Sequence, residues 1–121
     1  MKLAVVGSRT FGQRDVLFER VAAYVATHPV TSLVTGGARG ADALAEEVAR
    51  ELSLPCTIVR AEWRTHGRAA GPLRNAKIAK LADAVLAFVD KPLAESSGTH
   101  DTVRRFRKLG KPVEVVEVAR P

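Results

Sequence analysis

The chain has 121 residues, enough for one domain with a hydrophobic core, and its 46% hydrophobic and 26% charged residues exclude an intrinsically disordered chain. Its single cysteine, Cys56, excludes an internal disulfide and is typical of a reducing, cytoplasmic compartment. The formal net charge of +6 arises entirely after Val59, and no apolar run reaches the roughly 18 residues that a membrane span requires.

Short apolar runs alternate with longer amphipathic segments along the chain. Leu3–Val6 is an unalternating apolar run, which is typical of a strand covered on both faces. In chain order the pattern predicts five strands, over 3–6, 31–35, 56–59, 84–89 and 113–118. Four helices lie between them: over 15–27 with Asp15 as its N-cap, over 41–52, from Pro72 onward, and from Thr99 to Gly110.

This alternation predicts a single α/β domain over residues 1–121. We expect a Rossmann-like three-layer sandwich, with helices on both faces of a five-stranded, mostly parallel sheet. Right-handed crossovers favour the strand order 3-2-1-4-5. Ligands bind such sheets beyond the carboxyl ends of the strands, where the strand order reverses, so the loops after the strands are the predicted site.

Two glycine-containing loops follow the first and second predicted strands, at 7–12 and 35–42. Small residues let the backbone approach a ligand, and the helix N-terminus that follows each loop favours an anion. Ser8 adds a hydroxyl, while Arg9 and Arg39 add fixed positive charge. Neither loop is a P-loop or a dinucleotide fingerprint. The glycines either cradle an anion or only form tight turns, and two such loops at the expected edge favour the anion.

The later loops add similar groups. Arg74 and Asn75 fall in the first turn of the third predicted helix and face the same crevice. Gly98 and Thr99 form another helix N-terminus suited to phosphate. Trp63 has two interpretations, stacking on a base or capping the core.

The remaining reactive side chains carry no catalytic signature. His28, His66 and His100 lack metal-ligand spacing, so neither a metal nor a cofactor is predicted. Cys56 lies in an apolar run and is interpreted as an inert core thiol.

Three stretches, 7–9, 36–42 and 70–75, with Trp63 between the last two, resemble the YspA-like branch of the SLOG superfamily. The superfamily has a Rossmann-like fold. It includes the Lonely Guy phosphoribohydrolases, which release a base from a nucleoside 5′-monophosphate, and DNA-processing A proteins, which hold single-stranded DNA. The resemblance implies binding of a nucleotide or nucleotide-derived signal. The resemblance implies that the ligand-binding residues are Gly7, Ser8, Arg9, Gly36, Gly37, Gly40, Asp42, Arg74, Asn75, Gly98 and Thr99. Arg39 and Gly71, from the same stretches, are added to this set.

One departure from the phosphoribohydrolases concerns catalysis. The part of their Pro-Gly-Gly-x-Gly-Thr-x-x-Glu motif that follows the proline corresponds to 95–102 here, and Thr102 stands at the glutamate position. Threonine lacks the carboxylate that would stabilise positive charge developing on the sugar. Whether the chain is an enzyme therefore stays open. The catalytic candidates are Asp42 or Asp101 as the carboxylate and Arg74 as the phosphate or sugar anchor.

Three functions are compatible with the sequence. The first is a binding or sensing domain whose nucleotide phosphate lies on the 36–42 and 98–99 loops, with Arg9 and Arg74 as charge partners. The second is phosphoribohydrolase-like cleavage of the N-glycosidic bond of a nucleoside monophosphate. The third is single-stranded nucleic-acid binding by the basic second half, although few aromatic residues are available for stacking. No membrane partner is expected, and self-association as a homo-oligomer stays open.

Overall fold

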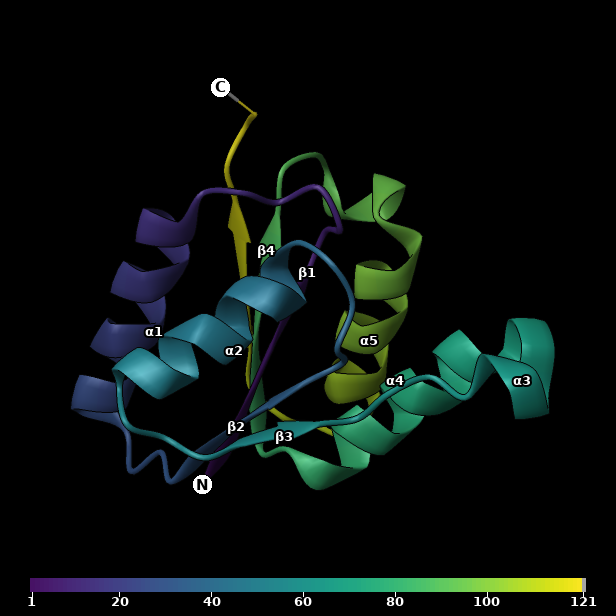
Figure 1. Ribbon diagram of the computed structural model, residues 1–121, viewed down its shortest axis with the longest axis horizontal. Helices are drawn as coiled ribbons and strands as arrows, with labels where there is room; N and C mark the ends of the chain where they lie inside the picture. The colour runs from purple at the N-terminus through teal and green to yellow at the C-terminus, as the bar shows by residue number, and fades with distance from the viewer. Residues whose placement is uncertain (121) are drawn as a thin grey trace.

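A computed structural model describes residues 1–120. One parallel sheet with the order β3-β2-β1-β4-β5 runs through the molecule and is seen nearly edge-on in Figure 1. Its strands are β1 (Lys2–Gly7), β2 (Ser32–Thr35), β3 (Cys56–Ile58), β4 (Ala84–Val89) and β5 (Val113–Glu117). This arrangement confirms the predicted α/β Rossmann-like fold and its strand order.

Helices cover both faces of the sheet (Figure 1). The helices α1 (Arg14–Thr27) and α2 (Ala41–Glu51) lie on one face, and α4 (Ala70–Leu81) and α5 (Ser97–Lys108) on the other. Short helical turns add α3 (Trp63–His66), η1 (Gly67–Ala69) and η2 (Leu93–Glu95), and α3 extends away from the body of the domain (Figure 1). Within residues 1–120, none of these helices combines the length and apolar character needed to cross a bilayer.

The hydrophobic core lies in two layers, one on each face of the sheet. Successive residues of β1 alternate between the layers: Leu3 and Val5 pack toward α1 and α2, whereas Ala4 and Val6 pack toward α4 and α5. Both faces are therefore apolar, which explains why the central strands are unbroken apolar runs. Cys56 is partly buried against the first layer, and burial raises the pKa of its thiol, in keeping with an inert core residue.

Three helices begin earlier than predicted. Gln13 precedes α1, so Asp15 lies in the first turn and is not the N-cap. Because α4 begins at Ala70, Arg74 and Asn75 fall in its second turn rather than its first, and α5 begins at Ser97 rather than Thr99. The first N–H groups of a helix have no intrahelical acceptor, so glycine and proline are tolerated there and apolar periodicity does not mark the first residue.

Candidate functional site

A cavity of about 600 Å³ opens where β1 and β4 end, which is the point at which the strand order reverses. Its walls come from the loop after β1, the first half of α4, the loop after β4 and the start of α5. This volume falls within the roughly 300–1,000 Å³ of small-molecule sites. The first cavity, as we call it, therefore has the position and size that the fold class predicts for a ligand.

A second cavity of about 440 Å³ adjoins the first on the β2 and β3 side. Arg9, Ala38, Trp63 and Arg74 line both cavities. The remaining walls of the second cavity are Gly36, Gly37, Arg39, Arg60 and Ala61.

The predicted binding residues gather at these cavities, with one exception. The first contains Gly7, Ser8, Arg9, Asp42, Gly71, Arg74, Asn75, Gly98 and Thr99, together with the catalytic candidate Asp101, and the second adds Gly36, Gly37 and Arg39. Gly40 lines neither cavity. It has φ +72°, and a Cβ there would lie 2.3 Å from the Ser8 carbonyl oxygen, so its role is to let α2 begin against the loop after β1.

Several lining residues were not among the predicted binding residues, among them Ser96 and Ser97 in the first cavity and Arg60 in the second. Two more carry polar groups. Thr10 and Lys91 both line the first cavity, in the loops that follow β1 and β4. The signal that identifies them is position alone, because both stand within a few residues of the carboxyl end of a central strand.

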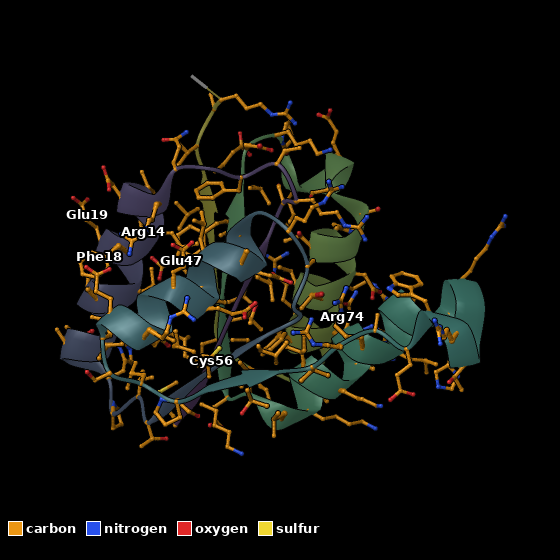
Figure 2. All side chains as sticks on the ribbon, viewed as in Figure 1. Arg14, Phe18, Glu19, Glu47, Cys56 and Arg74 are labelled. Atoms are coloured by element: carbon orange, nitrogen blue, oxygen red, sulfur yellow. The ribbon has the colours of Figure 1, made fainter. Side chains whose placement is uncertain are left out.

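Arg74 reaches from α4 toward the loop between β2 and α2 (Figure 2). Its Nη1 donates to the Gly36 carbonyl at 2.7 Å, and its Nε donates to Asn75 Oδ1 at 2.8 Å. Burial lowers the pKa of Arg74, the nearby Asp42 carboxylate opposes that shift, and Arg9 adds to it. The guanidinium remains a fixed cation in the wall between the two cavities.

Asp42 is the buried carboxylate of the first cavity, with 5% of its surface exposed. Burial raises its pKa, whereas the Ala38 N–H, which donates to Oδ2 at 3.2 Å, and the charge of Arg74 lower it. A Cβ on Gly36 would lie 2.7 Å from Arg74 Nη1 and 2.8 Å from Asp42 Oδ2, so glycine at this position admits both side chains.

The start of α2 is therefore less open to an anion than predicted for the loop 36–42. The Asp42 carboxylate accepts the Ala38 N–H, and the Ala41 N–H donates to the Ser8 carbonyl at 3.2 Å. The aspartate folds back onto its own loop, as short acidic side chains at helix starts commonly do. Other N–H groups of this loop, including those of Gly37, Arg39 and Asp42, form no hydrogen bond among residues 1–120, so the phosphate cradle at 36–42 stays a prediction.

The start of α5 presents a run of consecutive N–H groups without hydrogen bonds to the described part of the chain. Within residues 1–120 no acceptor lies within hydrogen-bond reach of the N–H groups of 97–99, and the first bonded N–H is that of His100, which donates to Ser96 O at 2.8 Å. Three buried hydroxyls stand beside this turn: Ser96 Oγ lies 3.5 Å from Ser8 Oγ and donates to Thr99 Oγ1 at 3.2 Å. A 12-residue helix thus points free donors and its positive end into the first cavity.

Asn75, on α4, forms hydrogen bonds to the first half of α5. Its Nδ2 donates to Gly98 O at 3.3 Å and to Asp101 Oδ2 at 3.1 Å. Asp101 also accepts hydrogen bonds from Arg104 at 2.8 Å and Arg105 at 2.9 Å. Burial alone would raise the pKa of Asp101, but the hydrogen bonds from Asn75 and the two arginines lower it, so this carboxylate is held ionised.

Replacing Asp101 with asparagine is expected to reduce the free energy of unfolding by about 1–2 kcal/mol at neutral pH, because charge-assisted hydrogen bonds are lost. The folded-state pKa lies below the unfolded one, so the stabilisation is complete above the unfolded value and is lost as the pH falls through the folded value. Urea unfolding across acidic pH should show wild type and D101N converging. Glu19→Gln, at an exposed position on α1, is the control. A difference that stays constant with pH would contradict the ionised link.

Trp63 is not part of the core. Its side chain is 53% exposed and lines both cavities, and a Cβ on Gly71 would lie 3.5 Å from its ring. The interpretation of Trp63 as a cap on the core is therefore wrong, and an indole face is available beside both cavities.

Comparisons with known proteins agree with this architecture. The model of a family described as YspA, cpYpsA-related SLOG family (YAcAr) matches residues 1–66. The Gene 61 protein of Mycobacterium phage D29 is 36% identical over 119 residues, which cover 93% of each chain. The structure of DNA processing protein A from Helicobacter pylori, described as having a unique single-stranded DNA-binding mode, superposes with a TM-score of 0.72 at 18% identity. That match covers 95% of this chain but 64% of the other, and at this identity it shows the common fold.

Proposed function

We propose that this chain, which belongs to the YspA, cpYpsA-related SLOG family, binds a nucleotide or nucleotide-derived ligand in the first cavity. One observation carries the proposal: the start of α5 directs three N–H groups without acceptors among residues 1–120 into a cavity at the switch point of the sheet. A phosphate group supplies the acceptor oxygens that such donors require.

The surrounding side chains fit the rest of a nucleotide. Arg9 and Lys91 add positive charge beside the phosphate position, and the Asp42 carboxylate can accept hydrogen bonds from sugar hydroxyls or base N–H groups. The exposed face of Trp63 offers a surface on which a base stacks. The lining of one cavity thus offers a chemically suitable group for each of the phosphate, the sugar and the base.

Calorimetry with nucleoside 5′-monophosphates of each base, compared with the matching nucleosides, tests this proposal. At least one monophosphate should bind, and its nucleoside should bind more weakly, because the α5 donors interact with the phosphate alone. A folded protein that binds no monophosphate, or that binds nucleoside and monophosphate equally, would refute the assignment.

A substitution at the first residue of α5 tests the backbone donors directly. Ser97→Pro should weaken monophosphate binding by about tenfold, because it removes one N–H bonded to a charged acceptor, a contribution of roughly 1.5 kcal/mol. Proline suits the first position of a helix, so α5 should persist. Ser97→Ala keeps the N–H and is the matched control. Equal affinities of the two variants would contradict the role of the amide.

A second function, cleavage of the N-glycosidic bond of the bound nucleotide, is favoured by Asp42. This carboxylate lines the cavity and is nearly inaccessible to solvent. Burial raises its pKa and favours the neutral acid, whereas Arg74 lowers the pKa and favours the anion. Perturbed carboxylates of this kind gather at catalytic sites. Release of free base, followed chromatographically, should occur with wild type and stop in Asp42→Asn if this second function is correct. Unchanged release in D42N would dissociate Asp42 from the chemistry.

A further inference from the structure

We infer that the second cavity binds a second phosphate group of the same ligand, so that this chain recognises a nucleoside carrying phosphates on two sides. The inference rests on the proposed function, since it presumes a nucleotide in the first cavity. It concerns a different set of residues, the arginines on the β2 and β3 side of the sheet edge.

The charge of the second cavity is uniformly positive. Arg9, Arg39, Arg60 and Arg74 line it, and no aspartate or glutamate does. The first cavity differs, because Asp42, Glu95 and Asp101 offset its three cations, Arg9, Arg74 and Lys91. A concave surface with several guanidinium groups and no carboxylate concentrates a field that favours a doubly charged anion.

These arginines are also free to bind. Among residues 1–120 no hydrogen bond or ion pair partner is found for the side chains of Arg9, Arg39 and Arg60. Five arginines elsewhere pair with carboxylates, as Arg20 does with Glu114 at 2.6 Å, whereas Arg50, Arg64, Arg68 and Arg107 also have no such partner among residues 1–120. Burial is the main cause of the lowered pKa of Arg74, Asp42 opposes it, and the like charge of Arg9 lowers the pKa further. An anionic ligand would relieve that repulsion.

Backbone geometry leaves space for one of these groups at the cavity. Gly37 has φ +71°, and a Cβ there would lie 2.8 Å from Ile58 Cγ2 and 3.2 Å from Arg60 Nη1. Arg60 therefore lies directly across the glycine backbone of the β2–α2 loop. A side chain at position 37 would be strained and would crowd Ile58 and Arg60, so the glycine leaves space for the guanidinium.

Trp63 lies at the boundary of the two cavities, where a ligand that reaches both would pass. Because Trp63, Arg9 and Arg74 line both cavities, the boundary between them carries an aromatic face flanked by two cations. A nucleoside stacked on that face would have one phosphate at the start of α5 and the other among the arginines. Nucleoside 3′,5′-bisphosphates and oligonucleotides share this chemistry, and the test separates them.

The experiment measures affinities for a nucleoside 5′-monophosphate, its 3′,5′-bisphosphate and a 5′-phosphorylated ten-nucleotide single strand, for each common base. Wild type should bind the bisphosphate at least about tenfold more tightly than the monophosphate. The double variant R39Q/R60Q should lose this advantage, so that it binds the bisphosphate no more tightly than the monophosphate. The matched control is R64Q/R68Q, which makes the same change of charge at positions that line neither cavity. Thermal unfolding of each variant verifies that it folds.

The outcomes separate the two proposals. If the monophosphate binds but the second phosphate adds nothing, or if R39Q/R60Q keeps the advantage, the inference is overturned and the proposed function stands. If no nucleotide binds the folded protein, the proposed function falls and the inference with it.

A strand that binds no better than the bisphosphate supports the inference with a small ligand. A strand that binds more tightly, with affinity falling steeply as salt rises, supports it with single-stranded nucleic acid.

Discussion

Gly7→Ala is expected to reduce the free energy of unfolding by about 3 kcal/mol, because the added methyl group has no space. The new Cβ would lie 2.0 Å from the Phe88 carbonyl oxygen and 2.7 Å from Ala41 Cβ. Gly7 pairs with Phe88 at the end of the β1–β4 ladder, and the Phe88 carbonyl accepts the Ser8 N–H at 2.9 Å. Neither neighbour is the end of a flexible side chain, so the strands or α2 must move apart.

Chemical denaturation at neutral pH measures this loss, with Gly12→Ala as the control. Gly12 lies in the same loop, and a Cβ there meets no atom within 4 Å, so G12A should stay within about 0.5 kcal/mol of wild type. Because β1 and β4 end at the first cavity, G7A should also weaken nucleotide binding under conditions in which it remains folded. A stability close to that of G12A would mean that β1 and β4 separate at little cost.

The fold was predictable because its determinants are local. Unbroken apolar runs such as Leu3–Val6 and 84–89 arise when helices cover both faces of a strand, and the handedness of crossovers restricts how such strands are ordered. The starts of α4 and α5 were not predictable in the same way. No side chain caps either helix, and α4 follows directly on the turn η1, so apolar periodicity does not mark where Ala70 and Ser97 begin their helices.

The site was predictable only as a sheet edge. Topology brings the loops after the strands together, which is why residues as distant as Ser8 and Thr99 line one cavity. The direction of a side chain is a different matter. The Asp42 carboxylate accepts a local hydrogen bond from Ala38, but the position of Trp63 outside the core depends on packing between segments far apart in the chain. The gathering of Arg39 and Arg60 in one acid-free cavity has the same origin.

Arg74→Gln is expected to weaken nucleotide binding by about 30-fold, the largest effect on affinity of any single side chain at the site. Arg74 lines both cavities and holds the β2–α2 loop through the Gly36 carbonyl, so its loss removes charge from both phosphate positions. It also leaves the buried Asp42 carboxylate without its nearest described cation, and that negative charge then repels the ligand. The figure corresponds to about 2 kcal/mol, within the range for hydrogen bonds to charged groups.

Calorimetry on R74Q, R74K and Arg68→Gln separates charge from geometry. Lysine keeps the positive charge but not the two-nitrogen reach to Gly36 and Asn75, so R74K should bind with an affinity between those of wild type and R74Q. Arg68 lines neither cavity, and R68Q should bind as wild type does. If R68Q weakened binding as much as R74Q, the general positive charge of the surface, and not the cavity wall, would account for affinity. Equal binding by R74K and wild type would instead show that Arg74 acts as a point charge, with no need for its contact to the Gly36 loop.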